Sequence, residues 1–327
     1  MKFQTARRWL ASAMLATSCA ALVAPTSTHA QSDKLTRFIL PVAAGSGVDT
    51  IMRASQKALS ASLGTAVVID NQPGAGGIVG TQTLVKAAPD GATLSVVSNN
   101  HVIYPSVYKT LPFDPIRDIT PIAVIGSSPM VLVVNPKLPA RDSKELVALL
   151  KAKPDTLNYA SSGNGTILHL AAEMFLDEAG VKAKHIPYKG VGPMITDLIG
   201  GQVDFGVLAL PAIQAHLKSG ALRAIGTSSK ARLSAAPEIP TFAEQGLSGY
   251  LVEGWFAVIG PKGLPTAEVK RINAAFASAF ATADVKDAMA KQGNPINVTT
   301  PEAAAAFFVS EMDKYARLVK RAGVKLD

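Results

Sequence analysis

The feature that most constrains the fold of this 327-residue chain is a regular alternation of short apolar segments with longer amphipathic ones. Segments such as 93–98 and 203–208 have the length and composition of buried strands, whereas 49–63 and 167–178 have the apolar spacing of helices. Strands that alternate with helices form βαβ units with parallel strands. We therefore predict an α/β protein built on largely parallel sheets.

The alternation divides the chain into two groups of elements, which indicates two lobes rather than one domain. We expect strands at 35–41, 66–70, 93–98, 122–126, 130–135, 157–160, 185–188, 203–208, 221–227 and 255–259. We expect helices at 49–63, 78–87, 143–152, 167–178, 194–199, 213–217, 265–282 and 301–321.

The sequence predicts where the helix over 143–152 begins, where the helix over 301–321 ends, and which face of the latter is buried. Ser143 should be the N-cap of the helix over 143–152, and Gly323 should end the last helix. The last helix also carries apolar residues at helical spacing, which we expect to pack against the first lobe: Phe308, Met312, Tyr315 and Val319.

The N-terminal segment predicts export. Three basic residues precede an uncharged stretch over 9–25, and the small residues Thr28 and Ala30 follow it. This pattern is typical of a secretory signal peptide over residues 1–30, cleaved near Ala30. Arg7-Arg8 leaves a twin-arginine route open, and Cys19 leaves lipidation open. Cleavage near Ala30 removes the chain's single cysteine, which excludes cysteine chemistry in the mature protein.

The charge of the chain argues against a nucleic-acid partner. Lys and Arg number 32 against 24 Asp and Glu, for a net charge of +8, but the basic residues form no long run. Nucleic-acid recognition needs basic residues gathered on one face. A dispersed excess of this kind indicates a mild attraction for small anions.

Three strand-to-helix junctions have the composition of anion-binding loops: 43–49, 161–166 and 189–193. The first N–H groups of a helix lack intrahelical acceptors and carry the positive end of its dipole, so they favour a carboxylate. Glycine allows close approach to the backbone, and hydroxyls such as those of Ser46 and Thr166 add donors. One such loop alone is better explained as a tight turn with a cap. Matched loops in both lobes favour binding.

Other chemistries fit the sequence poorly. The glycines of 74–80 depart from a dinucleotide fingerprint, because Val79 stands where glycine is required. A hydrolase built on Ser46 and one of the histidines lacks the G-x-S-x-G elbow. His169 and Glu173 share a helix face but have no third ligand, so we predict no metal and no cofactor. We expect a binding protein and not an enzyme.

At these loops the sequence closely resembles the Bug receptors, the solute-binding components of tripartite tricarboxylate transporters. The resemblance covers the whole mature chain. Its ordered matches are Pro41-Val42-Ala43-Ala44-Gly45, Asn71-Gln72-Pro73-Gly74-Ala75-Gly76-Gly77, Lys86-Ala87-Ala88-Pro89-Asp90-Gly91, Leu111-Pro112-Phe113-Asp114-Pro115, Leu157-Asn158-Tyr159-Ala160-Ser161-Ser162-Gly163-Asn164-Gly165, Pro187-Tyr188-Lys189-Gly190, Gly200-Gly201-Gln202-Val203-Asp204 and Ala322-Gly323-Val324-Lys325-Leu326-Asp327.

The resemblance implies a periplasmic, monomeric receptor with a two-lobed type II periplasmic-binding fold. Lobe 1 would comprise 31–128 and 252–327, lobe 2 would comprise 129–251, and crossover strands would lie near 128–134 and 249–258. A small organic acid would be captured between the lobes for the membrane permease. A sensor for a signalling kinase is the alternative, and a periplasmic hydrolase is a more distant one. The implied ligand-binding residues are Ala44, Gly45, Ser46, Val48, Asp49, Asn99, Ser161, Gly165, Thr166, Leu208 and Ala209.

Two departures from the family pattern bear on the ligand. Relatives often carry Gly-Pro-Thr-Asp where this chain has 46–49, and Asp-Ser where it has Leu208-Ala209. Apolar groups thus replace two polar contacts, so an aromatic or branched monocarboxylate is as good a hypothesis as a citrate-like acid. Lys189 is a candidate partner for a ligand carboxylate or a solvated loop charge. Asp204, at the far end of its strand, should be structural.

Overall fold

The computed structural model describes residues 35–152, 154 and 156–322. The predicted signal peptide with its cleavage near Ala30 lies outside the described residues, as does the predicted helix end at Gly323.

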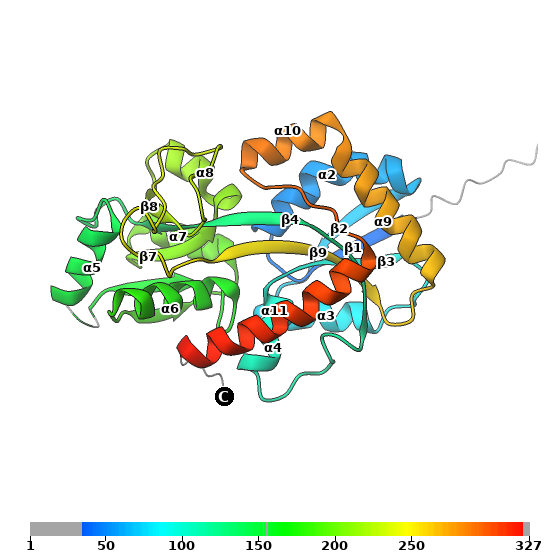
Figure 1. The fold of residues 1–327 in the computed structure, drawn as a ribbon, viewed down its shortest axis with the longest axis horizontal. Coiled ribbons are helices and arrows are strands. Elements are labelled where there is room, and N and C mark those ends of the chain that lie inside the picture. Colours follow the sequence, from blue (N-terminus) through cyan, green and yellow to red (C-terminus); the bar gives the residue numbers. More distant parts are fainter. Residues whose placement is uncertain (1–34, 153, 155, 323–327) are drawn as a thin grey trace, which may run out of the picture. The chain divides into compact units, whose positions relative to one another are not determined.

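Strands and helices alternate along the described chain, which confirms the α/β class (Figure 1). The strands are β1 (Leu35–Leu40), β2 (Ala66–Asn71), β3 (Thr93–Ser98), β4 (Ile119–Val134), β5 (Asn158–Ser161), β6 (Lys184–Pro187), β7 (Phe205–Ala209), β8 (Arg223–Thr227) and β9 (Glu253–Pro261). The helices are α2 (Gly47–Leu63), η1 (Ala75–Gly77), α3 (Ile78–Val85), α4 (Asn100–Val107), α5 (Ser143–Ala152), α6 (Ile167–Ala179), α7 (Val191–Gly200), α8 (Leu210–Lys218), α9 (Thr266–Ala281), α10 (Ala283–Gln292) and α11 (Pro301–Ala322).

The strands form two parallel groups joined by antiparallel ones. Their order is β2-β1-β3-β9-β4-β7-β5-β6, with β8 also paired to β4. The pairs β1–β2, β1–β3, β5–β6 and β5–β7 are parallel, whereas β9 and β4 pair antiparallel with their neighbours. We call the group around β1 lobe 1 and the group around β5 lobe 2. The carboxyl ends of the parallel strands lead into the loops that the sequence singles out.

The long strand β4 passes from lobe 1 into lobe 2. The sequence predicts separate strands at 122–126 and 130–135, but β4 runs unbroken through Ser127, Ser128 and Pro129. These residues stay in the ladder because they pair with Trp255, Gly254 and Glu253 of β9. Beyond Pro129 the strand pairs with β7 and β8 of lobe 2 instead. The prediction of two strands was wrong. Ser127, Ser128 and Pro129 do not end β4, because β9 continues to pair with it at these positions.

Apolar residues cover both faces of the sheet in lobe 1. Along β1, Phe38 and Leu40 belong to one buried cluster and Ile39 belongs to the other. This is the two-residue period of a strand that is buried on both sides. Helices α2, α9 and α10 cover the first face, while α3, α4 and α11 cover the second (Figure 1). The second cluster continues into lobe 2, so that part of the core is shared.

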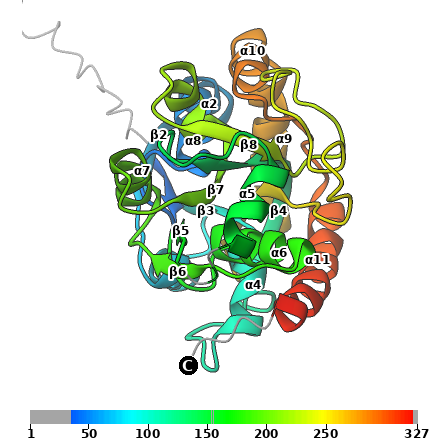
Figure 2. The same cartoon turned by 90° about the vertical axis from the view of Figure 1, so that its left-hand side faces the viewer.

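Helix α11 packs against more than the sequence predicts. Its buried residues Phe308, Tyr315 and Val319 face α4 and β4 in the shared core, but the helix also lies beside α6 of lobe 2 (Figure 2). At this seam the Arg321 Nε donates to Asp177 Oδ2 at 2.9 Å. The predicted packing of the stripe on lobe 1 is confirmed, and the helix additionally contacts α6 of lobe 2.

Two local predictions need correction. The N-cap of α5 is Asp142 and not Ser143, since the Asp142 Oδ1 accepts from the Glu145 N–H at 2.8 Å. Helices α4 and α10 were not predicted. Helix α4 contains Pro105 and shows weak apolar periodicity, and both helices are short. Their conformation depends on packing in the tertiary structure.

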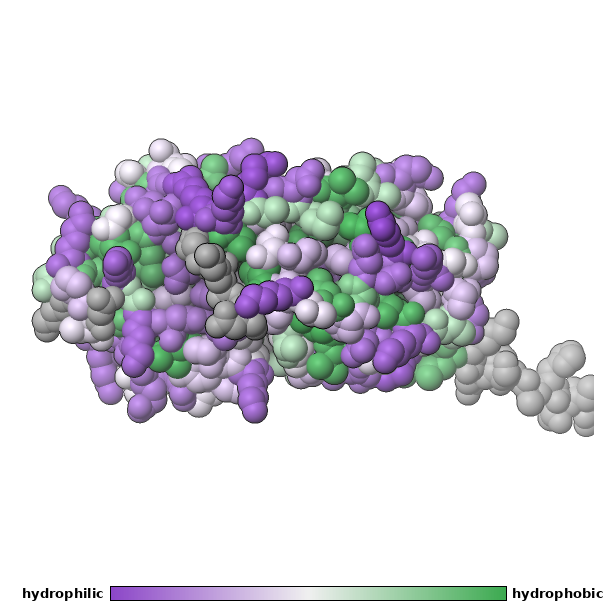
Figure 3. All heavy atoms as spheres, turned by 90° about the horizontal axis from the view of Figure 1, so that it is seen from below, coloured by the Kyte–Doolittle hydropathy of each residue, from purple (hydrophilic) through white to green (hydrophobic). Residues whose placement is uncertain are grey.

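The surface of the described residues is mixed in polarity. Hydrophilic residues are interspersed with small hydrophobic patches on the face seen from below (Figure 3). Exposed large apolar side chains such as Val79 and Val309 are scattered along the chain, and single exposures of this kind need no partner. No helix among the described residues is long and apolar enough to cross a bilayer.

Candidate functional site

Two adjoining cavities lie between the lobes and contain part of the predicted site. The larger has a volume of about 1070 Å³ and the smaller about 60 Å³. Both are lined by Val42, Ser46 and Asn100 of lobe 1 and by Ser162 and Val191 of lobe 2. The two cavities therefore form one cleft, with a narrow inner pocket and a wide outer chamber.

The eleven predicted residues divide into two sets. Six line the cleft: Ser46, Val48, Asn99, Thr166, Leu208 and Ala209. Five line neither cavity, although all of them belong to the predicted loops: Ala44, Gly45, Asp49, Ser161 and Gly165.

The first loop ends in a capped helix whose N-terminus faces the inner pocket. Ser46 is the N-cap of α2, and its Oγ accepts from the Asp49 N–H at 3.3 Å. The N–H groups of Gly47 and Val48 have no acceptor among the described residues, and both residues line the pocket. A Cβ on Gly47 would lie only 3.2 Å from the Ala209 Cβ of lobe 2. Glycine here lets the helix end approach the opposite lobe.

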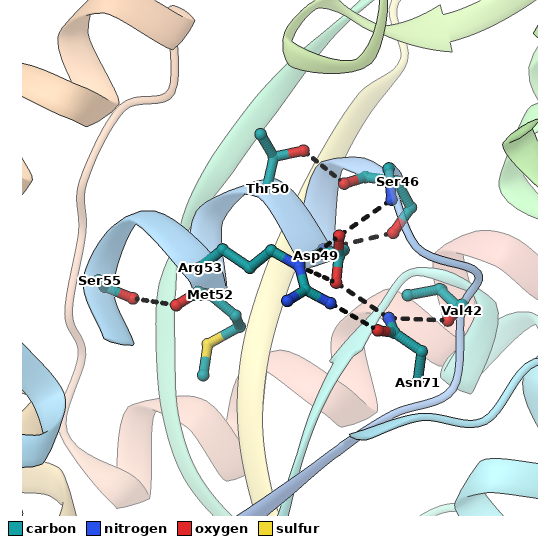
Figure 4. A network of polar contacts seen from close by, with 9 residues as sticks. Val42, Ser46, Asp49, Thr50, Met52, Arg53, Ser55 and Asn71 are labelled. Atoms are coloured by element: carbon teal, nitrogen blue, oxygen red, sulfur yellow. Dashed lines mark hydrogen bonds and ion pairs between the residues drawn. The ribbon is translucent and has the colours of Figure 1, made fainter. Parts of the chain in front are cut away.

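Asp49 holds the loop through a network of hydrogen bonds (Figure 4) and lines neither cavity. Its carboxylate accepts from the Gly45 N–H at 2.9 Å, from Arg53 Nε at 3.0 Å and from Asn71 Nδ2 at 3.0 Å. Burial alone would raise the pKa of Asp49, but the bonds from Arg53, Gly45 and Asn71, with the charge of Arg53, outweigh burial and lower the pKa. Asn71 also donates to the Val42 carbonyl at 3.2 Å. The network thus fixes the loop from behind.

The lobe 2 loop has a similar construction. Thr166 is the N-cap of α6, and its Oγ1 accepts from the His169 N–H at 3.4 Å and donates to the Gly163 carbonyl at 2.8 Å. The Leu168 N–H has no acceptor among the described residues, and Leu168 lines the inner pocket. Helix N-termini from both lobes therefore reach the same small space.

A histidine pair supports this loop from behind. The rings of His169 and His185 stack with centroids 3.9 Å apart. His169 Nδ1 accepts from the Gly165 N–H at 3.1 Å, and His185 Nε2 lies 2.7 Å from Ser161 Oγ. Burial, assisted by the charge of His185, lowers the pKa of His169 to about 3, and burial lowers the pKa of His185 to about 4. Both rings are therefore neutral at pH 7.

The Ser161–His185 contact has the elements of a nucleophile and base, but its position does not suit catalysis. Ser161 is fully buried and lines neither cavity. The hydroxyl already hydrogen-bonds to the Gly163 carbonyl at 3.1 Å and accepts from the Gly163 N–H at 3.2 Å. A substrate in the cleft therefore does not reach it.

Asparagines at the end of β3 join the elements around the cleft. Asn99 is fully buried, donates to the Glu253 carbonyl and the Tyr315 hydroxyl, and accepts from the Trp255 N–H at 3.0 Å. Its polar atoms are thus committed to protein partners, although it lines the inner pocket. Asn100, which the sequence reasoning missed, spans the lobes: its Oδ1 accepts from the Ile167 N–H of α6 at 2.7 Å.

Further contacts close the rim of the cleft. The Tyr108 hydroxyl donates to the Asn164 carbonyl of lobe 2 at 3.3 Å. Gly190, with φ of +118°, lies so close to lobe 1 that a Cβ there would be 2.8 Å from the Ala43 Cβ. The lobes therefore touch at several points. Tyr108 also was missed, because it is the C-cap of the unpredicted helix α4.

The outer chamber has few charged groups. Its walls include Tyr108, Tyr188 and the three prolines Pro41, Pro73 and Pro187. Lys189 is the charged residue among the described residues that line it. Burial, with the hydrogen bond to Asp197 and the charge of that carboxylate, raises the pKa of Tyr188 to about 12. Hydroxyl and amide residues such as Ser162, Asn164 and Thr166 also line it, so the chamber offers a wall of mixed polarity with one cation among the described residues.

Asp204 and possible metal ligands lie elsewhere in the structure. The Asp204 carboxylate accepts from the Asn158 N–H at 2.7 Å, a contact between neighbouring strands. Glu173 hydrogen-bonds to Tyr159 and lies 3.9 Å from His169 Nε2. Among the described residues, no three His, Cys, Asp or Glu side chains are grouped as metal ligands would be.

Comparison with known proteins finds a matching family and similar solved structures. The family described as tripartite tricarboxylate transporter family receptor matches residues 51–324. BugT of Bordetella pertussis is 34% identical over 309 residues, covering 94% of this chain and 95% of BugT. The structure of the periplasmic binding protein BugD matches with a TM-score of 0.86 at 30% identity, covering 89% of this chain and 99% of BugD. An R. palustris protein solved with adipate has a TM-score of 0.86 at 29% identity, with coverage of 89% and 98%.

Proposed function

We propose that this chain, which belongs to the receptor family of tripartite tricarboxylate transporters, captures a small organic acid between its two lobes and delivers it to the membrane permease of such a transporter. The family and the two-lobed fold are those of periplasmic solute-binding receptors. One observation carries the proposal for the acid. The first turns of α2 and α6, from opposite lobes, reach the same inner pocket with the N–H groups of Gly47, Val48 and Leu168 unpaired.

This arrangement favours an anion for two physical reasons. Unpaired first-turn N–H groups are hydrogen-bond donors, and each helix N-terminus carries a partial positive charge. An anion near one helix N-terminus gains about 0.3–1 kcal/mol at a surface and up to about 2 kcal/mol where the site is partly buried. Two helices act on one carboxylate in the inner pocket. The remaining affinity comes from burial of the ligand body in the outer chamber.

Capture proceeds by closure of the lobes. We place lobe 1 at 31–128 and 252–327 and lobe 2 at 129–251, with β4 and β9 as the connection. Bonds such as Asn100 to Ile167 and Tyr108 to Asn164 require the lobes to be together. A ligand that contacts both helix N-termini binds the closed form better, and it shifts the equilibrium by that difference in affinity. The closed monomer then docks on the permease.

The lining points to an acid with a weakly polar body. Val48 and Leu208 contribute apolar side chains to the inner pocket, and the outer chamber combines tyrosine and proline walls with hydroxyl and amide groups and with Lys189 as its cation. The R. palustris relative was solved with adipate, whose carboxylates are separated by an apolar chain. An acid of this type, with one carboxylate in the inner pocket and a second group near Lys189, fits better than the compact, highly charged citrate.

The proposal also includes export of the chain to the periplasm and binding of the ligand without chemical change. We infer that residues 1–30 direct the chain to the periplasm and are removed near Ala30, which N-terminal sequencing of the periplasmic protein tests directly. A receptor returns its ligand unchanged. Prolonged incubation followed by mass spectrometry should therefore recover the bound acid intact, whereas a stoichiometric excess of product would identify a hydrolase.

The binding test combines a ligand panel with a matched pair of glycine variants. Thermal-shift and calorimetric titrations would use adipate, citrate, benzoate and isovalerate. Gly47→Ala introduces a methyl group 3.2 Å from the Ala209 Cβ, beside the proposed carboxylate site, and should weaken binding about tenfold. Gly192→Ala, also in the first turn of a helix but with no atom within 4 Å of the added Cβ, should leave binding unchanged. Equal affinities of the two variants, or no binding of any acid by the wild type, would reject the proposal.

A further inference from the structure

One buried hydroxyl in the inner pocket has no role in holding the fold together. Ser128 lies on β4 at the crossover between the lobes and is fully buried. It lines the inner pocket, and its Oγ has no hydrogen-bond partner among the described residues. Buried side-chain hydroxyls normally have a partner, because an unpaired one costs about 1–3 kcal/mol.

Other buried serines on strands and nearby loops show the usual arrangement. The fully buried Ser95 of β3 donates to the Ile39 carbonyl at 2.7 Å. The buried Ser228 donates to the Val252 carbonyl at 2.6 Å. Alanine or glycine would fill the position of Ser128 without an unpaired group. The hydroxyl is therefore best explained by a polar partner that enters the pocket.

The surroundings of Ser128 define the chemistry of that partner. Much of the pocket wall is apolar, with Met130, Leu208 and Phe256 among its residues. The polar groups that point to a ligand are the unpaired N–H donors of α2 and α6 and the Ser128 hydroxyl. Donors on several sides favour an oxygen-rich, negatively charged group and disfavour an ammonium. A volume of about 60 Å³ exceeds the roughly 10–15 Å³ that one water requires and accommodates a small head group.

We propose that Ser128 is a specificity-determining residue whose hydroxyl donates to a carboxylate oxygen of the ligand at the inner end of the cleft. This inference rests on the proposed function, and it adds a third anchor to the two helix N-termini. The ladder of β4 changes partners here: Pro129 pairs with Glu253 of β9, and Met130 pairs with Ala209 of β7. A carboxylate held by Ser128 thus contacts lobe 1, lobe 2 and the strand between them, so a neutral head group loses contacts with all three.

The test uses the opposite effects that Ser128→Ala should have on the stability of the ligand-free protein and on ligand binding. Ser128→Ala removes an unpaired hydroxyl, so the Tm of the ligand-free protein should stay the same or rise. The same substitution should weaken binding of the strongest-binding acid among adipate, citrate, benzoate and isovalerate by at least about tenfold, because a hydrogen bond to a charged group is lost. The matched control is Ser95→Ala, which removes a paired hydroxyl away from the cleft. It should lower the Tm and change affinity less than about twofold.

Each alternative outcome has a distinct meaning. If Ser128→Ala lowers the ligand-free Tm as Ser95→Ala does, the hydroxyl has a structural partner and the inference is wrong. If the wild type binds an acid and Ser128→Ala binds it equally well, the role of Ser128 is rejected while the proposed function stands. If the wild type binds none of the four acids, the proposed function fails, and the role of Ser128 fails with it.

Discussion

Replacing Asn100 with alanine tests whether contacts between the lobes contribute to affinity. The side chain makes two hydrogen bonds: Oδ1 accepts from the Ile167 N–H of lobe 2 at 2.7 Å, and Nδ2 donates to the Gly76 carbonyl of lobe 1 at 3.0 Å. Each is worth about 0.5–1.5 kcal/mol net. Only the first crosses between the lobes, so the substitution should disfavour the closed form by about that amount and weaken ligand binding about 2- to 12-fold.

Asn273→Ala is the matched control for this substitution. Asn273 Nδ2 donates to the Ile122 and Thr299 carbonyls, both at 2.8 Å and both within lobe 1. Both variants should lower the free energy of unfolding by about 1–3 kcal/mol, measured by urea denaturation without ligand. Only Asn100→Ala should weaken binding in calorimetry, and it should enlarge the radius of gyration in solution scattering. If Asn100→Ala loses stability as the control does but keeps full affinity, the hydrogen bond between Asn100 and Ile167 does not contribute to ligand binding.

The remaining predictions concern the two groups that support the loops from behind. Because His169 and His185 have lowered pKa values, about 3 and about 4, the folded protein binds fewer protons than the unfolded chain below pH 6.5. The free energy of unfolding should thus be highest above pH 6.5 and fall as the pH drops toward 4, and His185→Gln should flatten this slope in urea titrations; parallel slopes for the two proteins would contradict it. Asp49→Ala should lower the free energy of unfolding by about 2 kcal/mol and also weaken ligand binding, because the loop that carries Ser46 loses its support. Asp114→Ala, which removes a carboxylate bonded to two backbone N–H groups in a different loop, should lower stability alone; equal binding by both aspartate variants would show that Asp49 does not position the site.

The fold and the location of the candidate cleft were predictable because their signals are local in the sequence. A strand followed by Gly and Ser and then by an amphipathic helix predicts a capped helix N-terminus at the carboxyl edge of a sheet. Ser46 and Thr166 cap α2 and α6 at such positions. Two loops of this kind were sufficient to indicate the cleft.

The orientation of individual side chains was less predictable. Asp49, Ser161 and Gly165 lie in the predicted loops but bond to the protein and line neither cavity. Asn71 and His185, which bond Asp49 and Ser161, lie 22 and 24 residues away in the sequence, so only the tertiary structure brings them to these loops. Arg53 and His169 are local partners, four residues after Asp49 and Gly165. Asn100 and Tyr108 were missed for a related reason. Asn100 begins α4 and Tyr108 is its C-cap, and the stability of this short proline-containing helix depends on packing against α11.

The position of β9 in the sheet has a consequence for the order in which the chain can fold. Strand β9 lies between β3 and β4, yet its residues 253–261 come after the whole of lobe 2 in the sequence. Until they are available, β3 and β4 each lack the neighbour that fills the middle of the lobe 1 sheet. Pairings between residues so far apart in sequence form slowly. A nascent chain that lacks its last quarter therefore cannot complete the lobe 1 sheet, so lobe 1 forms only after the sequence of lobe 2 has been synthesised.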